Sequence, residues 1–532
     1  MKKKLGTIIE NALHKAKYVD KAFDIDFGKI AIDHPKNGQF GDYSTNIAMV
    51  LAKKVGKSPM EVAGVLMSVI SQLVADEAYF EKMEVVMPGY INFYLATQYL
   101  QESVLHINEQ GEHFGDSQIG KGIRINNEFI SGNPTGPLHV GNGRAGFFND
   151  TLTKVLRKNG FSVDNEYYIN DAGGQVIKLG HSVLKDSEAV YTGEYIEQLH
   201  VKYGDLSDVR EIGFLSSQEI VESIIKKTVS EGMKISYDIW TSEKSIQEKG
   251  LVTKAINTFK EHGFTYESEG ALWLKTSDFG DEKDRVLIKS NGEKSYFASD
   301  CGYLLDKIDR KYDRMILSLG ADHHGYVARM KAAASELGFA GDFRIVLSQM
   351  VRLVKDGKEV RMSKRAGNVV YIDDLLEEFG HDVSRFFFLM YSPDTHMNFD
   401  MGLAQERSQK NPVFYVQYAH ARICSILKNA ENPVNSKEYV QLLHHEKELA
   451  LIKELNKFPQ LVEEIADSYA AHKLAHFAIS VADKFHSFYD ACRVIDASSP
   501  ELTKARLLLV NAARIVLAET LRLIGVDALE KM

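Results

Sequence analysis

GNPTGPLHVGNGRAG, at residues 132–146, is the stretch that decides the fold of this chain. It follows Arg124–Ile130 (RINNEFI), whose alternating polar and apolar residues predict a strand. It leads into an amphipathic segment, from about Arg144 to Arg157, that predicts a helix. A loop between a strand and a helix presents free backbone N–H groups and the positive end of the helix dipole. We therefore predict an anion site here, with phosphate as the usual occupant and Arg144 adding charge at its rim.

Strands and helices alternate along the middle of the chain. Phe161–Tyr168 (FSVDNEYY) predicts a second strand, and Arg314–Leu319 (RMILSL) and Phe343–Leu347 (FRIVL) predict two buried strands. A helix is predicted between these two strands, over Val327–Leu337. Such alternation is typical of a parallel α/β sheet. The region from about 181 to 265 is helix-like, and we interpret it as an insertion into this unit.

Glycine content separates the C-terminal part of the chain from the rest. The chain has 39 glycines, yet residues 403–524 contain none. Because glycine is poor inside helices and common in turns, this stretch predicts an all-helical domain. Residues before the first motif form a separate mixed unit that ends in an apolar, strand-like run, Glu84–Leu95. The predicted fold is α/β, with an α+β N-terminal domain at 1–115, a parallel-sheet domain at 116–404 and an all-α domain at 405–532.

Composition excludes several classes of protein. Of the 532 residues, 44% are hydrophobic and 26% are charged, as in an ordinary globular protein. Cys301, Cys424 and Cys492 lie far apart and make neither a disulfide framework nor a metal-binding pair. We recognise no signal peptide and no run of about 18 apolar residues, so we expect a cytoplasmic protein without a membrane partner. The net charge of −9 does not exclude a nucleic acid, because charges act locally, within about 8–10 Å.

A second motif, RMSKR at 361–365, ends the basic stretch VRLVKDGKEVRMSKR. From residue 351 to residue 365 there are six basic residues against two acidic ones. A loop that carries ammonium groups can stabilise the charge of a phosphate transition state when the loop closes. The alternative interpretation is a solvated basic hairpin that turns at Asp356-Gly357.

Together the two motifs resemble the His-Ile-Gly-His and Lys-Met-Ser-Lys-Ser signatures of class I aminoacyl-tRNA synthetases. Within that class the chain is similar to the bacterial type of arginyl-tRNA synthetase, from about residue 35 to the C-terminus. The resemblance implies a Rossmann-type catalytic domain, which joins arginine to its transfer RNA with ATP, and an anticodon-binding C-terminal domain. It rests on GQFGDYSTNIAM (38–49), EYYINDAGGQ (166–175), GALWLKTSDFGDEKDRVLIKS (270–290), SLGADHHGYVARMKAA (318–333) and NPVFYVQYAHARICSI (411–426).

By this resemblance ATP binds at both signatures, accompanied by Mg²⁺ and without a metal held by the protein itself. The implied catalytic residues are His139 and Asn142 in the first signature and Arg361 and Lys364 in the second. Asn142 stands where the family usually has its second histidine, and it keeps an N–H donor that cannot become cationic. The implied ATP-binding residues are Gly132, Asn133, Pro134, Thr135, Gly136, Pro137, Leu138, His139, Val140, Gly141, Asn142, Asp322, His324, Met362, Ser363, Lys364 and Arg365.

A pocket for arginine should offer carboxylates and carbonyl oxygens to a planar guanidinium with five donors. By resemblance, Glu128, Ser131 and Asn133 contact the amino and carboxylate end of arginine. Tyr296 and Asp300 match the positions near the guanidinium, and Asp300 is the natural charge partner.

The segment from Asn411 to Ile426 carries the implied RNA contacts, because aromatic and arginine side chains can stack on unpaired bases. Each tyrosine in it is at least as easily explained as part of the core. By resemblance alone, the N-terminal domain contacts the outer corner of tRNA(Arg), arginine activation needs bound tRNA, and the enzyme is a monomer. The implied tRNA-binding residues are Tyr415, Gln417, Tyr418 and Arg422.

Three alternatives remain open. A cysteinyl-tRNA synthetase would use a zinc-bound cysteine, which three scattered cysteines do not supply. A small-molecule nucleotidyltransferase would share the phosphate loop but would leave the glycine-free helical region unexplained. A catalytically inactive RNA-binding protein is the third alternative, and Asn142 is the residue that favours it.

Overall fold

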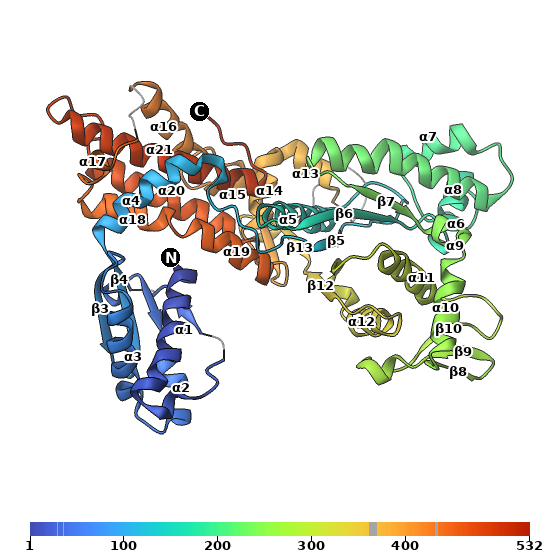
Figure 1. The fold of residues 1–532 in the computed structure, drawn as a ribbon. Helices are drawn as coiled ribbons and strands as arrows, with labels where there is room; N and C mark the ends of the chain where they lie inside the picture. The colour runs from blue at the N-terminus through green and yellow to red at the C-terminus, as the bar shows by residue number, and fades with distance from the viewer. Residues whose placement is uncertain (29, 36, 361–369, 431–434) are drawn as a thin grey trace.

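The computed structural model describes residues 1–28, 30–35, 37–360, 370–430 and 435–532. At its centre lies a sheet of five parallel strands in the order β12-β11-β5-β6-β7 (Figure 1). The predicted parallel sheet is confirmed, and its four predicted strands agree with observed strands to within two residues at each end. The strands are β5 (Arg124–Glu128), β6 (Ser162–Ile169), β7 (Ile239–Ser242), β11 (Arg314–Gly320) and β12 (Asp342–Ser348).

Both faces of this sheet are covered, and strand β11 shows how. Successive side chains of a strand point to opposite faces, so Met315 and Leu317 join one apolar cluster and Ile316 joins another. Helices α11 (Tyr296–Asp309) and α12 (Tyr326–Glu336) pack on the first face, and α5 (Val140–Lys158) packs on the second. Burial on both sides explains why β11 is a nearly continuous apolar run.

The region 181–265 is largely helical, as predicted, but it is more than an insertion. Ile239–Ser242 forms β7, which pairs with β6 in parallel and completes the central sheet. The interpretation of this region as an inserted helical segment missed β7, because four residues are too few to show the period of a strand. The helices are α6 (Gly174–Leu184), which leads into the region, α7 (Glu194–Tyr203), α8 (Val209–Ile220), α9 (Glu243–Glu248) and α10 (Leu251–Glu261), with π-helical turns at Val221–Ile225 and Thr228–Gly232.

Two small sheets flank the central one. The first has the order β10-β9-β8, and the second has the order β14-β13-β15. Their strands are β8 (Thr265–Ser268), β9 (Ala271–Leu274), β10 (Arg285–Ile288), β13 (Val351–Lys355), β14 (Lys358–Glu359) and β15 (Met397–Asp400). The helices near the second sheet are α13 (Ile372–Phe379), α14 (His381–Leu389) and α15 (Met401–Gln405).

The N-terminal unit is α+β, as predicted, with a four-stranded antiparallel sheet in the order β1-β2-β4-β3. The single strand-like run expected over Glu84–Leu95 is wrong, because the run spans a hairpin. Its turn contains Pro88, which has no N–H to donate to a ladder, and Gly89, whose φ is 141°. The elements are α1 (Lys2–Val19), β1 (Ile32–Asp33), β2 (Tyr43–Thr45), α2 (Ile47–Val55), α3 (Pro59–Leu73), β3 (Phe80–Val86), β4 (Tyr90–Leu95) and the exit helix α4 (Thr97–Gln110).

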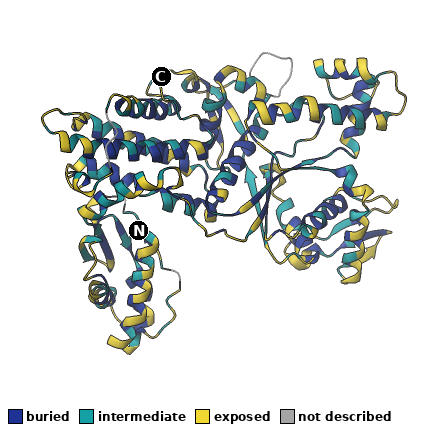
Figure 2. Cartoon of the chain, turned by 45° about the horizontal axis from the view of Figure 1, so that its top comes forward, coloured by how far each residue is buried: buried dark blue, intermediate teal, exposed yellow. Residues whose placement is uncertain are grey.

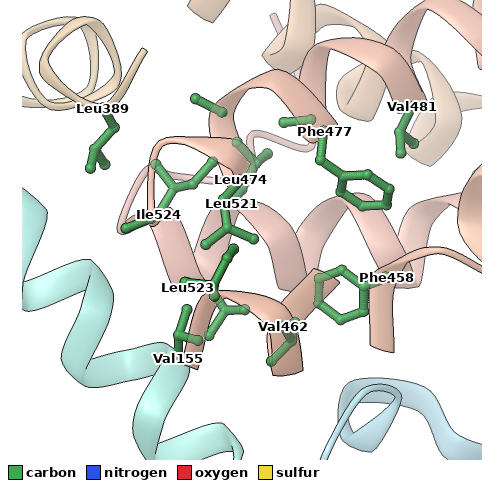
Figure 3. Packing of buried hydrophobic residues seen from close by; sticks show 14 of the residues in the cluster. Val155, Leu389, Phe458, Val462, Leu474, Phe477, Val481, Leu521, Leu523 and Ile524 are labelled. Carbon is green, nitrogen blue, oxygen red and sulfur yellow. The ribbon is translucent and has the colours of Figure 1, made fainter. Parts of the chain in front are cut away.

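The C-terminal region is helical throughout its described residues, as the lack of glycine predicts. Figure 2 shows its buried residues along the inner sides of the helices and its exposed residues along the outer sides. In Figure 3, Val155 of α5 faces Val462 and Leu523, so the same core joins this bundle to the central sheet. In the described part of the chain, no helix is both long and apolar enough to cross a membrane. The helices are α16 (Pro412–Lys428), α17 (Lys437–Val440), α18 (Glu446–Leu455), α19 (Phe458–Ser468), α20 (Lys473–Ala491) and α21 (Pro500–Ile524).

The end of α21 is fixed to α5 by a buried arginine, which gives a prediction for Gly525. Arg385 is fully buried and bonds to Asp150 and to the carbonyl oxygen of Ile524. Gly525 has a φ of 82°, and a Cβ there would lie 2.4 Å from Cζ of Arg385. Because this side chain cannot move away, we expect Gly525→Ala to lower the free energy of unfolding by about 2 kcal/mol more than backbone strain alone.

Gly280→Ala is the matched control for that strain. Gly280 has a φ of 93°, and a Cβ added there would have no atom within 4 Å, so it reports the cost of the backbone conformation without a collision. Urea unfolding followed by far-ultraviolet circular dichroism compares the two variants. Equal destabilisation would show that Arg385 yields easily and that the contact at Gly525 is not tight.

Candidate active site

The first signature begins helix α5 with a reciprocal cap. Nδ1 of His139 accepts a hydrogen bond from the backbone N–H of Gly141 at 3.1 Å. Oδ1 of Asn142 accepts from the backbone N–H of His139 at 3.0 Å. The helix therefore begins at Val140, four residues before the predicted start at Arg144. Residue 142 thus has a structural task for which an asparagine oxygen is suited.

This cap also sets the proton on His139. A backbone N–H can only donate, so Nδ1 accepts and the neutral ring carries its proton on Nε2. Burial lowers the pKa of His139, and the nearby negative charge of Asp322 acts in the opposite sense. At neutral pH the ring is therefore a neutral donor at Nε2. The remaining donor of Asn142, Nδ2, lies 3.6 Å from the place where a Cβ on Gly132 would stand, so it faces the same loop.

The described residues on either side of the second signature contact the first signature or the helix that it begins. Arg361, Met362, Ser363, Lys364 and Arg365 themselves lie outside the described residues. The chain enters this segment from the hairpin β13–β14, whose turn is at Asp356 (φ 52°) and Gly357 (φ 73°). The hairpin of the alternative interpretation is therefore present, and it leads directly into the motif.

Beyond the second signature, the chain returns to pair with the first. The N–H of Val140 donates to the carbonyl of Val370 at 3.0 Å, and the N–H of Ile372 donates to the carbonyl of Leu138 at 2.9 Å. His139 and Tyr371 form an antiparallel bridge between these two bonds. The described chain that resumes at Val370 is thus tied to the loop that contains His139.

The C-terminal ends of β5 and β11 bring further predicted residues to the same edge of the sheet. Asp322 and His324 follow β11 on the exposed turn after Gly320. Ser131 follows β5, and its Oγ donates to Glu128 at 3.1 Å and accepts from the N–H of Tyr168 at 3.1 Å.

The turn after β5 is strained. Ile130 and Ser131 have φ values of 67° and 39°, which non-glycine residues rarely adopt and which cluster at functional sites. The turn is held from β6, since Oη of Tyr167 donates to the carbonyl of Gly132 at 3.0 Å. Asn133, in the next position, is exposed.

A group of buried carboxyls lies beside this turn. Burial raises the pKa of Asp300 well above its usual range, and the charges of Glu243 and Glu128 raise it further. Burial also raises the pKa of Glu243 to about 7, with a contribution from the charge of Asp171. The positive charge of Arg329 lowers the pKa of Asp300 and so opposes these effects. A bound guanidinium ligand would relieve the remaining repulsion between the carboxylates.

Three residues of this region differ in what they offer. Glu128 was expected at the amino end of arginine, but its carboxylate is paired with the ammonium of Lys307, so it is already engaged. Tyr296 is 65% exposed, and its Oη accepts from the N–H of Gly174 at 3.3 Å. Glu243 is absent from the sequence-based site, because it follows the unpredicted strand β7. The only local signal is an acidic residue at the start of a helix, in TSEKS.

Arg144 is not at the rim of the anion site, which corrects the prediction. Its side chain is 2% exposed, and its guanidinium donates to the carbonyls of Gln349, Ser392 and Thr395. Nothing in the local sequence indicates that Arg144 is buried, because the segments that enclose it are more than 200 residues away along the chain.

Helix α16 presents an aromatic surface together with α20. Tyr418 stacks with Phe414 and with His486, at ring distances of 6.4 and 6.1 Å. The guanidinium of Arg422 lies 4.1 Å from the ring centre of Tyr489. Unpaired bases can stack on planar aromatic and guanidinium groups of this kind.

The other two predicted RNA contacts on α16, Gln417 and Tyr415, differ in how much of each side chain is exposed to solvent. Gln417 is 7% exposed, and its amide donates to Asp382 at 2.8 Å and to the carbonyl of Asp527 at 3.0 Å. It is thus not placed to contact RNA, which corrects the prediction for this residue. Tyr415 is half-buried, 5.1 Å from the ring of His486.

Comparisons with known proteins agree with this architecture. Methionyl-tRNA synthetase of Mycobacterium tuberculosis has a TM-score of 0.58 at 12% identity, covering 76% of this chain and 92% of that one, which shows a shared fold. Residues 215–386 match the family described as "tRNA synthetases class I (R), catalytic domain". The fold and the site thus define a class I aminoacyl-tRNA synthetase.

More specific matches cover nearly the whole chain. Residues 3–95 match the "Arginyl tRNA synthetase N terminal domain", and residues 416–532 match the "DALR anticodon binding domain". The arginine–tRNA ligase of Bacillus subtilis is 40% identical over 94% of each chain. That of Listeria monocytogenes is 42% identical over 95% of this chain and 94% of its own. The chain belongs to the arginyl-tRNA synthetase family.

Solved structures of similar fold have lower sequence identity. Thermus thermophilus arginyl-tRNA synthetase has a TM-score of 0.77 at 22% identity, covering 99% of this chain and 100% of that one. The Plasmodium falciparum enzyme has a TM-score of 0.78 at 18% identity, covering 100% and 99%. These likenesses concern the fold of the whole chain.

Proposed function

We propose that this chain attaches L-arginine to tRNA(Arg) with ATP, for protein synthesis in the cytoplasm. The arginine carboxylate attacks the α-phosphorus of ATP and releases diphosphate, which leaves arginyl-adenylate. The terminal adenosine hydroxyl of the tRNA then attacks the mixed anhydride, giving arginyl-tRNA(Arg) and AMP. The proposal rests on the capped His139 loop, together with the acidic residues Glu243, which is buried, and Asp300, which is partly buried.

The protein's part in adenylate formation is positioning and charge stabilisation rather than covalent catalysis. ATP, with its Mg²⁺, binds along residues 132–142, where Nε2 of His139 and Nδ2 of Asn142 donate to phosphate oxygens. Asp322 and His324 face the nucleotide from the end of β11. Arg361 and Lys364 supply positive charge, with Met362, Ser363 and Arg365 as neighbours on the same loop.

The arginine side chain binds with its guanidinium between Asp300 and Glu243. A planar fork of donors can satisfy two carboxylates at once, which an ammonium cannot match. Ser131 and Asn133 receive the amino and carboxylate end, and Tyr296 closes the mouth of the pocket. Glu128 keeps Ser131 in place through its hydrogen bond.

This pocket predicts a pH dependence for arginine. Burial holds the pKa of Glu243 at about 7, above the usual range, so the carboxyl is partly protonated at neutral pH. Because the guanidinium favours ionised carboxylates, we expect the KM for arginine to fall as the pH rises from about 6 to about 8. The measurement is the KM for arginine in pyrophosphate exchange across that range. Glu243→Gln should flatten the profile, and an unchanged profile in this variant would contradict the assignment.

The domains divide the work of tRNA recognition. We assign catalysis to residues 116–404, anticodon binding to 405–532 and contact with the outer corner of the tRNA to 1–115. Tyr415, Tyr418 and Arg422 offer planes to anticodon bases, with Phe414, His486 and Tyr489 extending the same surface. We propose that the enzyme acts as a monomer.

Pyrophosphate exchange tests the proposed activity. The purified chain is incubated with ATP, labelled diphosphate and each amino acid in turn, with and without a tRNA pool. Label should enter ATP with arginine, and the tRNA pool should be required. Exchange with cysteine or another amino acid would reassign the pocket. Absence of exchange with every amino acid, from folded protein that binds tRNA, would support the inactive RNA-binding alternative.

A further inference from the structure

Arg144 is a buried cation whose partners are all neutral. Its Nη1 donates to the carbonyl of Gln349 at 2.8 Å, and its Nη2 donates to the carbonyls of Ser392 and Thr395, each at 2.7 Å. Its Nε has no partner among the described residues. Burial lowers the pKa of the guanidinium to about 10, and the charge of Asp394 opposes that effect. A buried charge without an ion pair is costly, so its retention calls for a reason.

The three carbonyls lie just before strands β13 and β15, and we call these residues, 349 and 392–395, the root of the β13–β14 hairpin. Gln349 precedes β13 and Thr395 precedes β15, and these strands pair in parallel with Val351 opposite Met397. The N–H of Gln349 also donates to the carbonyl of Pro393 at 2.8 Å, so the segments before β13 and β15 are joined to each other. From this root, β13 and β14 run to Val360, the residue before the second signature.

Arg144 lies on the helix that the first signature begins. It is two residues after Asn142 and five after His139, in the first turns of α5. The chain beyond the second signature, which the structure describes again from Val370, already pairs with that loop through Val140 and Val370 at 3.0 Å. Among the described residues, the β13–β14 hairpin before the signature has no such backbone pairing with α5. Arg144 is the side chain that supplies the connection, through the hairpin root.

Only a guanidinium suits this position. Its rigid fork donates in several directions in one plane, whereas an ammonium is a single point on a flexible stem. Three carbonyls from two separate segments therefore converge on one side chain whose geometry is fixed. Lysine would keep the charge and lose the simultaneous bonds.

We propose that Arg144 is a positioning residue that holds the root of the β13–β14 hairpin, which leads to the second signature, on helix α5, which the first signature begins. This rests on the proposed function, and it deepens it. Arg144 touches neither ATP nor arginine. Its effect is on how the charge of the second signature reaches the phosphates held by the first.

The test compares Arg144→Lys and Arg144→Ala with Arg157→Lys. Arg157 lies on the same helix, but its guanidinium is half-exposed and bonds to Asp238 and to the carbonyl of Val163. In pyrophosphate exchange, Arg144→Lys should lower kcat by about 100-fold, since a small misplacement far from the chemistry has an effect of that size. The KM for ATP should rise while the KM for arginine and the affinity for tRNA stay within about twofold. Arg157→Lys should behave as the unaltered chain.

Two readouts separate positioning from general loss of structure. Guanidinium ion at low, non-denaturing concentration should restore part of the kcat of Arg144→Ala, because it can refill the site. Amide hydrogen exchange of Arg144→Lys should speed up in Val351–Lys355 and not in α21. If Arg144→Ala does not fold, the lysine variant alone decides.

Several results would overturn the proposal. One is an unchanged kcat in a folded Arg144→Lys. Another is an equal change in the KM values for ATP and arginine. A third is faster exchange spread over the whole chain, which would make Arg144 a general stabilising residue. Failure of the unaltered chain to exchange diphosphate with any amino acid would instead count against the proposed function, so the two failures are distinguishable.

Discussion

Replacement of His139 by alanine is expected to lower the kcat of arginine-dependent pyrophosphate exchange by about 100- to 1,000-fold. Removal of one preorganised donor to developing phosphate charge has an effect of this size. His139 meets the requirement because its Nδ1 is occupied by the N–H of Gly141, which leaves the proton on Nε2. The KM for arginine should change little, since the arginine pocket lies on other residues.

His139→Asn separates the chemical role of this residue from its structural one. Asparagine is a good residue at the start of a helix, so α5 should still begin at Val140. The asparagine side chain is shorter than histidine and does not reach the phosphates, so kcat should stay as low as in His139→Ala. His113→Ala, at a side chain that is 70% exposed, is the control for loss of a histidine. If His139→Asn keeps full activity, the ring serves the helix cap and not the phosphates.

Replacement of Asp300 by asparagine is expected to lower kcat/KM for arginine by about 100- to 1,000-fold. The amide has the same shape, so the loss measures the charge that a buried guanidinium needs. The effect should lie in the KM for arginine, with the KM for ATP and the affinity for tRNA unchanged. Asp300 is suited to this role because burial and the charge of Glu243 keep its pKa high until a cation arrives.

Asp309→Asn is the matched control for Asp300. It lies on the same helix, α11, and pairs with Lys254 at a side-chain exposure of 48%. Citrulline, the neutral isostere of arginine, gives a second readout. The unaltered enzyme should not use citrulline, and Asp300→Asn should reduce the preference for arginine over citrulline. A normal KM for arginine in Asp300→Asn would move the guanidinium site elsewhere.

The backbone of the central unit could be predicted because its local signals agree. RMILSL and FRIVL are apolar runs of strand length, and both faces of the sheet need such runs. The helices of the C-terminal region could be predicted equally directly, because glycine is poor inside helices and residues 403–524 contain none. By contrast, β7 is four residues long, and its place at the sheet edge depends on pairing with β6.

The errors at the site have one physical cause, which is that burial arises from distant parts of the chain. Arg144 is polar and stands close to two glycines, yet segments at 349 and 392–395 enclose it. Gln417 lies on a stretch with the composition of an RNA-binding segment, yet its amide donates to the carboxylate of Asp382 and to the carbonyl of Asp527. Glu243 could be found only once β7 placed it next to Asp300. The first signature could be identified because it lies between a predicted strand and a predicted helix and because it resembles the class I signature.

We propose that this chain charges tRNA with arginine. The most direct measurement is aminoacylation of a total tRNA pool with ATP and each radiolabelled amino acid in turn. We expect arginine alone to become attached, the charged molecules to be tRNA(Arg), and AMP and diphosphate to form in equal amounts with the product. Charging with a different amino acid, or no charging by folded protein that binds tRNA, would contradict it.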